Sequence, residues 1–98
     1  MSVVKKIKLN SIENGLEEIV SLSSRIKISQ EELLFLDTKI KENTKAFSEG
    51  ALSESRYKGK EKSLQKERKK LEKNINFEIK RAIRKIEAVK KVIERVEI

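Results

Sequence analysis

The chain has 98 residues, and its 24 Lys and Arg outweigh its 16 Asp and Glu to give a formal net charge of +8. It contains no Cys, His, Pro or Trp. A chain of this length holds at most one domain. Without Cys and His it lacks disulfides, thiol nucleophiles, imidazole bases and the commonest metal ligands. We therefore expect no enzymatic activity, no cofactor and no metal site.

Composition also narrows the class of protein. No apolar run approaches the roughly 20 residues that span a bilayer, and no signal peptide is visible, so we expect a cytoplasmic protein. Abundant Lys, Glu and Ile are typical of a long helix or coiled coil, and they are equally typical of thermophiles.

The first predicted helix covers residues 10–48. Residues 1–9 fit a short strand or a frayed helix equally, whereas Asn10 with Glu13 forms a plausible capping box that starts a helix. Ser29 with Glu32 is a second possible start, but the heptad phase continues through Ser29 and favours one helix. Large apolar residues recur every seven positions, which predicts one continuous stripe facing a partner: Ile12, Ile19, Ile26, Leu33, Ile40 and Phe47.

A turn is predicted over residues 49–53, followed by a second helix over residues 54–96. Gly50 suits the left-handed residue that ends a helix, and Ser53 suits the cap of the next one. From Ile75 onward the apolar residues of the second helix alternate steps of four and three, as in a coiled-coil seam. The apolar set of this helix is Tyr57, Leu64, Leu71, Ile75, Ile79, Ala82, Ile86, Val89 and Ile93.

The two stripes match each other when the chain folds back at residue 52. Facing residues of an antiparallel pair have a nearly constant sum of residue numbers, and the apolar residues of the two stripes pair at 104 or 105. These pairs are Phe47–Tyr57, Ile40–Leu64, Leu33–Leu71, Ile26–Ile79, Ile19–Ile86 and Ile12–Ile93. The sequence therefore predicts an all-α fold, a long antiparallel helical hairpin or coiled coil.

Several apolar residues lie off this seam: Leu34, Phe35, Phe77, Ile83 and Val92. They are either scattered surface residues, which are normal, or a second apolar face that pairs with another copy or a partner helix. We favour the second interpretation, because two helices alone bury little area. The hairpin is then expected to self-associate or to bind a protein partner within a larger helical assembly.

The positive charge lies on the second arm. Residues 1–55 hold 8 basic and 9 acidic residues, whereas residues 56–98 hold 16 basic and 7 acidic ones. A basic stripe recurs at helical spacing along this arm: Lys62, Lys66, Lys69, Lys73, Lys80 and Arg84. It is a solvated face, a surface for anionic lipid headgroups, or a surface that binds nucleic-acid phosphates without sequence specificity. Few Arg and no interleaved aromatic residues count against nucleic acid.

The sequence gives little support for catalysis. Adjacent carboxylates such as Glu17 and Glu18 diverge on a helix surface, so they are interpreted as solvated charge. No glycine-rich phosphate loop occurs, and no His is present to activate a Ser. A non-enzymatic interaction protein remains.

The turn from Phe47 to Lys58 resembles one found in helical proteins of archaeal cell division. There a helix ends in Gly, which is followed by a small residue, Leu or Ile, a capping residue, Glu and then Tyr; here these are Gly50, Ala51, Leu52, Ser53, Glu54 and Tyr57. The segment is similar to the coiled-coil part of the Cdv proteins, which recruit the ESCRT-like machinery. The resemblance implies a scaffold that polymerises or bridges a membrane and partner filaments. The alternative is a basic helical protein associated with nucleic acid.

Overall fold

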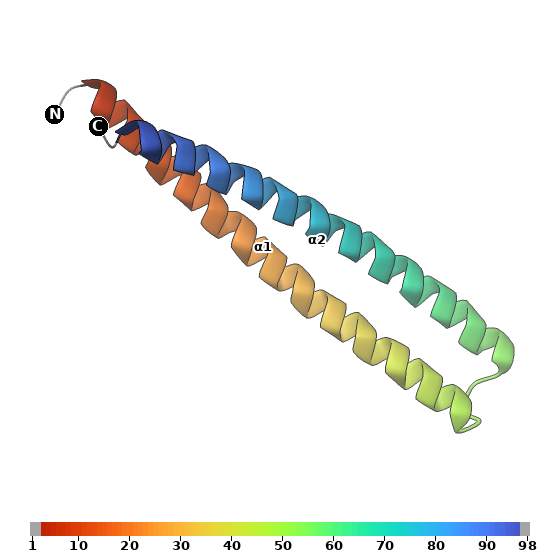
Figure 1. The fold of residues 1–98 in the computed structure, drawn as a ribbon. Helices are drawn as coiled ribbons and strands as arrows, with labels where there is room; N and C mark the ends of the chain where they lie inside the picture. The colour runs from red at the N-terminus through yellow and green to blue at the C-terminus, as the bar shows by residue number, and fades with distance from the viewer. Residues whose placement is uncertain (1–2, 97–98) are drawn as a thin grey trace. The chain divides into compact units, whose positions relative to one another are not determined.

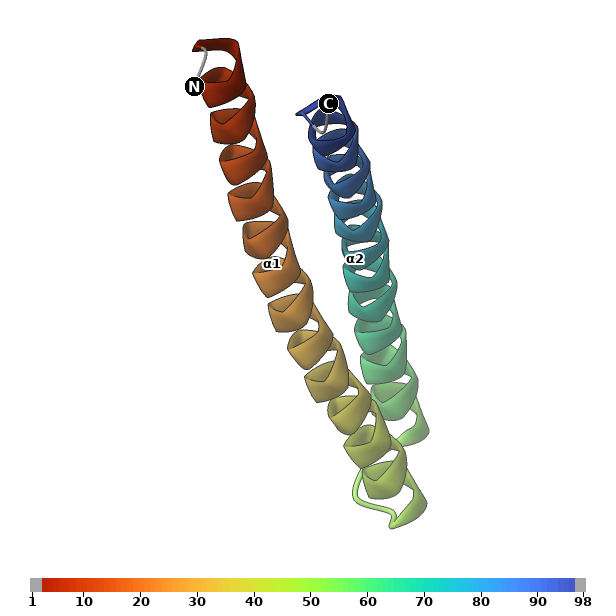
Figure 2. The same cartoon turned by 60° about the vertical axis from the view of Figure 1, so that its left-hand side comes forward.

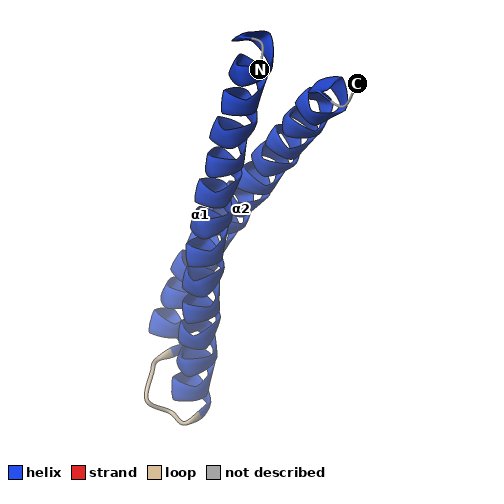
Figure 3. Cartoon of the chain, turned by 90° about the vertical axis from the view of Figure 1, so that its left-hand side faces the viewer, coloured by secondary structure: helices blue, strands red, loops and turns tan. Residues whose placement is uncertain are grey.

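A computed structural model describes residues 3–96 as two helices joined by a loop. Helix α1 is Val3–Ser48 and helix α2 is Glu54–Val96, and no strand occurs within this range (Figure 1). The loop between them is tan in Figure 3. The predicted all-α helical hairpin is therefore confirmed.

The chain divides into two compact units, each made from one segment of either helix. Unit 1 comprises Met1–Lys27 and Asn76–Ile98, and unit 2 comprises Ile28–Ile75. Because the chain reverses direction at the loop, the segments of α1 and α2 run antiparallel within each unit (Figure 2). Both units are thus pairs of antiparallel helices, but only unit 2 includes the loop.

Helix α1 begins at Val3, seven residues before the predicted start at residue 10. Asn10 and Glu13 therefore lie inside the helix and do not cap it. Neither Gly nor Pro occurs before residue 10, so nothing forces the backbone out of the helical conformation there. Residues 1–2, which belong to the predicted N-terminal segment, lie outside the described range. The helix also continues through Ser29 without a break.

The loop ends α1 and starts α2 with side chains and backbone in the predicted roles. Gly50 has a φ of 78°, and it donates from its N–H to the carbonyl of Phe47 at 3.1 Å, while Ala51 donates to Ala46 at 2.8 Å. This pair of bonds is a Schellman motif, which satisfies the last carbonyls of the helix. On the other side, the Ser53 hydroxyl accepts from the N–H of Arg56 at 3.3 Å and caps α2.

In unit 2 the two helices pack in the predicted register. The rings of Phe47 and Tyr57 stack with centroids 4.4 Å apart. Leu36 and Ile75 are buried. Asn43 is also buried, and its Nδ2 donates to the carbonyl of Tyr57 at 3.3 Å. A buried polar residue in a helix–helix seam lowers stability, and here one of its polar groups is satisfied by the facing backbone.

In unit 1 the seam is closest at Gly15. The side chains of Leu22 and Val89 are buried, and a Cβ on Gly15 would overlap Cγ2 of Val89. Gly15 and Val89 therefore face each other, at the same sum of residue numbers, 104, as Phe47 and Tyr57 in unit 2. The absence of a side chain at residue 15 lets the two helices approach.

Candidate interaction surfaces

The residues of α2 that face α1 include one heptad row that differs from the prediction, so part of the predicted seam is wrong. Residues 57, 64, 71, 78, 85 and 92 form one row that is partly shielded from solvent. Ile79, Ile86 and Ile93, each predicted to face α1, instead lie one residue further round the helix and are exposed by 37–49%. Glu78, Lys85 and Val92 occupy the seam in their place, and Phe47 at the other end is 38% exposed.

A one-residue shift turns a helix by about 100°, so it decides which side of the seam these isoleucines border. Long side chains such as Lys85 tolerate the seam because the aliphatic stem packs while the ammonium reaches the edge. The packing of Val89 against Gly15 sets the phase of α2 in unit 1. The predicted seam pairs at 105 are therefore displaced by one residue.

Unit 2 shows which rows of the two helices border the same face. The Arg68 Nε donates to Oδ1 of Asp37 on α1 at 2.8 Å, and its Nη1 donates to Glu72 on α2. Asp37 and Glu72 each follow a seam residue directly, Leu36 and Leu71. The two rows that follow the seam therefore lie on one face, and in unit 2 that face is polar. The neighbouring carboxylates raise the pKa of Arg68, first through the hydrogen bond to Asp37.

The same rows carry aliphatic residues in unit 1. Leu16 on α1 occupies the row of Asp37, and Ile79, Ile86 and Ile93 on α2 occupy the row of Glu72. Val20 and Ile83 lie one helical turn from Leu16 and Ile79 and widen the patch. We call this surface the apolar face, and its six side chains are exposed by 37–65%: Leu16, Val20, Ile79, Ile83, Ile86 and Ile93.

The opposite face of unit 1 is polar. Two grooves of about 180 and 250 Å³ open there, and Glu18 lines both. Lys85 forms an ion pair with Glu18 across the two helices. The hydrogen bond and the charge of Lys85 lower the pKa of Glu18. Unit 1 therefore presents an apolar face on one side of its seam and a charged one on the other.

Covering the apolar face would be favourable. A fully buried aliphatic side chain contributes roughly 1.5–3 kcal/mol, so covering a half-exposed one contributes about 1 kcal/mol. Aligned exposed aliphatic residues of this kind mark interaction sites more often than single ones do. The apolar face is the strongest candidate interaction surface among the described residues.

The predicted second interface does not gather on one surface. Of its five residues, only Ile83 belongs to the apolar face. Val92 lies in the seam. Leu34 is exposed in unit 2. Phe35 lines a groove on the other side of that unit, where the ammonium of Lys39 lies 4.6 Å from its ring. Phe77 is exposed as well, but it projects from α2 away from the row of the isoleucines.

Leu16 and Val20 were missed in the sequence, although they are i,i+4 neighbours next to the predicted stripe. Their spacing is a usable signal, because such a pair shares one side of a helix. The sequence predicts Ile79 and Ile86 as seam residues, whereas the structure leaves them exposed. Placing them on the surface requires the rotation of α2 about its own axis, which heptad spacing defines only to within one residue.

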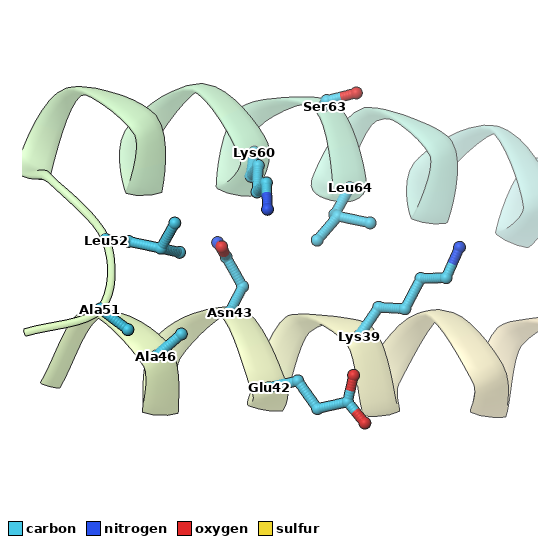
Figure 4. A pocket seen from close by; sticks show the side chains of 9 residues that line it. All are labelled: Lys39, Glu42, Asn43, Ala46, Ala51, Leu52, Lys60, Ser63 and Leu64. Carbon is cyan, nitrogen blue, oxygen red and sulfur yellow. The ribbon is translucent and has the colours of Figure 1, made fainter. Parts of the chain in front are cut away.

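A groove of about 500 Å³ in unit 2 lies beside the buried Asn43. Asn43 and Lys60 point toward each other across it, and Leu52 and Leu64 point into it, whereas Glu42 points away (Figure 4). The Oδ1 of Asn43 has no hydrogen-bond partner among residues 3–96. The groove is lined by residues of both helices and of the loop, and its lining combines aliphatic residues with two lysines. Its full lining is Lys39, Glu42, Asn43, Ala46, Ala51, Leu52, Lys60, Ser63 and Leu64.

The basic stripe is exposed along its whole predicted length, and its members belong to different units. Lys62, Lys66, Lys69 and Lys73 lie on unit 2, whereas Lys80 and Arg84 lie on unit 1. None of the ion pairs formed by residues 3–96 includes a member of the stripe. These cations are therefore available to an anionic surface.

The described residues hold no group of three or more Asp and Glu placed to bind a metal ion. Across residues 3–96, neither helix has an apolar stretch long enough to cross a bilayer. Comparison with protein-family models, with curated proteins and with solved structures gave no match for this chain.

Proposed function

We propose that this chain is a non-enzymatic helical scaffold, and that unit 1 binds helical protein segments through the apolar face. The observation that carries the proposal is the alignment of six exposed aliphatic side chains on one side of unit 1. The same rows in unit 2 hold the ion pairs of Arg68. Six exposed aliphatic side chains thus share one surface of unit 1, as expected for helix-on-helix docking.

Capture by immobilised protein tests this role with a matched pair of variants. Val20 and Leu34 occupy the same heptad row and are 65% and 66% exposed, but only Val20 belongs to the apolar face. Val20→Glu should lose the helical proteins that the wild type retains, because docking would bury an unpaired charge. Leu34→Glu should retain them. An identical set of proteins on both variants would contradict the proposal.

The basic stripe favours a second function, attachment of the scaffold to an anionic membrane surface. Each exposed lysine close to such a surface contributes roughly 1 kcal/mol of binding. Together with the resemblance of the turn to the Cdv proteins, this suggests a cytoplasmic scaffold in ESCRT-like membrane remodelling or archaeal cell division. The alternative is binding to the phosphate backbone of nucleic acid.

Co-sedimentation with phosphatidylserine vesicles, beside binding to random duplex DNA, separates these two possibilities across a salt series. Attachment to membranes predicts vesicle binding that weakens with salt and is lost in Lys66→Glu/Lys73→Glu. Duplex binding without vesicle binding would favour the nucleic-acid alternative. Absence of both would leave the basic stripe as a solvated face and the chain as a protein-binding scaffold alone.

A further inference from the structure

We propose that the occupant of the apolar face is a second copy of this chain, related by a two-fold axis that runs along the helices. In this arrangement α1 of each copy lies on α2 of the other, and the two units 1 form a four-helix contact. The inference rests on the proposed function, because it names the partner of the same surface.

Two copies of the apolar face can pack against each other, because both helices of unit 1 contribute residues to it. A two-fold dimer brings the same patch of both copies together, so the α1 part must match the α2 part. Since Gly15 lies opposite Val89, Leu16 and Val20 lie at the levels of residues 88 and 84. An axis along the helices therefore seats Leu16 and Val20 of one copy on Ile86 and Ile83 of the other.

Charged residues at the edges of the apolar face favour a two-fold axis that runs along the helices. Glu13 and Lys90 are exposed and lie at nearly the same level, on the outer rows of α1 and α2 that also hold Val20 and Ile83. Neither takes part in an ion pair among residues 3–96. When α1 lies on α2 of the second copy, Glu13 of each copy meets Lys90 of the other. The two-fold axis forms this contact twice.

The other two-fold arrangement lacks this complementarity. An axis across the helices would place α2 on α2, and centring it on Ile86 would bring Lys90 against Ile83 of the second copy. The ammonium would then lie on an aliphatic side chain with no carboxylate opposite. In unit 2 the rows of Leu16 and Ile79 hold Asp37 and Glu72, which pair with Arg68, so the aliphatic part of these two rows lies in unit 1.

Sedimentation equilibrium of the full chain at increasing concentration tests the inference. We expect the wild type to approach twice its chain mass of 11.4 kDa. In Val20→Glu the dissociation constant should rise roughly 100-fold, because a charge enters a buried contact. Leu34→Glu should dimerise like the wild type. Circular dichroism establishes that both variants keep their helices, since both side chains are exposed.

Three results would overturn the inference. A wild type that is monomeric at every concentration would exclude a second copy, and the capture experiment would then judge the scaffold function separately. Equal dissociation by Leu34→Glu would place the contact outside the apolar face. A monomer that binds neutral phosphatidylcholine vesicles, and loses this binding in Val20→Glu, would assign the face to lipid.

A charge exchange tests the axis itself. Glu13→Lys and Lys90→Glu should each weaken the dimer roughly tenfold, because each places like charges together in both symmetric contacts. The double variant Glu13→Lys/Lys90→Glu should regain most of the wild-type affinity. A double variant that dimerises no better than the single ones would overturn the proposed axis. Recovery cannot arise within one chain, since these residues lie on opposite edges of unit 1.

Discussion

Unit 1 and unit 2 are built from the same two helices, yet the residues that border their seams differ. In unit 2 the border is Asp37, Arg68 and Glu72, and the seam holds the stacked rings of Phe47 and Tyr57. In unit 1 the border on the same face is aliphatic, and the two helices approach closely at Gly15, which has no side chain. Unit 2 thus has polar residues beside an aromatic seam contact, whereas unit 1 leaves aliphatic side chains exposed beside its seam.

This difference shows that the most apolar row of a helix is not always the row that faces the other helix. Ile79, Ile86 and Ile93 form the more apolar row of α2, but Glu78, Lys85 and Val92 occupy the seam. Two helices can cover only the strip between them, so further aliphatic rows must remain exposed. Such rows are available to a partner.

The largest expected effect contrasts a seam position with a surface position in unit 2. Leu36→Asp should lower the free energy of unfolding by about 3 kcal/mol or more, because it places a charge among buried side chains. Leu34→Asp, two residues away and exposed, should change it by less than about 0.5 kcal/mol. Urea unfolding followed by circular dichroism measures both. Similar losses in the two variants would mean that the seam of α1 is misplaced.

A smaller effect compares a glycine in each unit. Gly59→Ala should stabilise α2 by about 0.5–1 kcal/mol, since helices favour Ala and no atom lies within 4 Å of the added Cβ. Gly15→Ala has the same advantage in helix propensity, but its Cβ overlaps the stiff side chain of Val89. We expect a net loss of about 1 kcal/mol in the thermal unfolding of Gly15→Ala.

The control for this pair is the double variant Gly15→Ala/Val89→Ala, compared with Val89→Ala alone. Removing the valine methyl groups makes room for the new Cβ, so adding Gly15→Ala in this background should be neutral or stabilising. If Gly15→Ala raises the thermal midpoint as much as Gly59→Ala does, the close approach in unit 1 is absent.

The smallest effect concerns the polar face of unit 1. Because Lys85 lowers the pKa of Glu18 in the folded chain, the pair stabilises the fold above the ordinary carboxyl pKa of 4.5. This stabilisation is lost as the pH falls through the lowered pKa and Glu18 becomes protonated. The thermal midpoint of the wild type should therefore exceed that of Glu18→Gln at pH 7, and the difference should disappear near pH 2. A difference that persists in acid would show that the ion pair is not its source.

Much of the fold follows from local signals in the sequence. The loop is predictable because Gly50 and Ser53 satisfy the backbone groups that the two helix ends leave unpaired. The register near the loop is predictable because the aromatic residues Phe47 and Tyr57 lie at equal distances from it. The early start of α1 was not predictable from Asn10 and Glu13, since a capping box competes with simple continuation of the helix.

By itself the sequence determined two long helices, the reversal between them and their pairing within one residue. Only the tertiary structure decided which row of α2 faces α1 in unit 1. That choice depends on Gly15, whose missing side chain admits Val89, and on Lys85, whose ammonium reaches Glu18. Both are contacts between residues about 70 positions apart, and heptad spacing within one helix carries no information about them. The apolar face is a consequence of that choice.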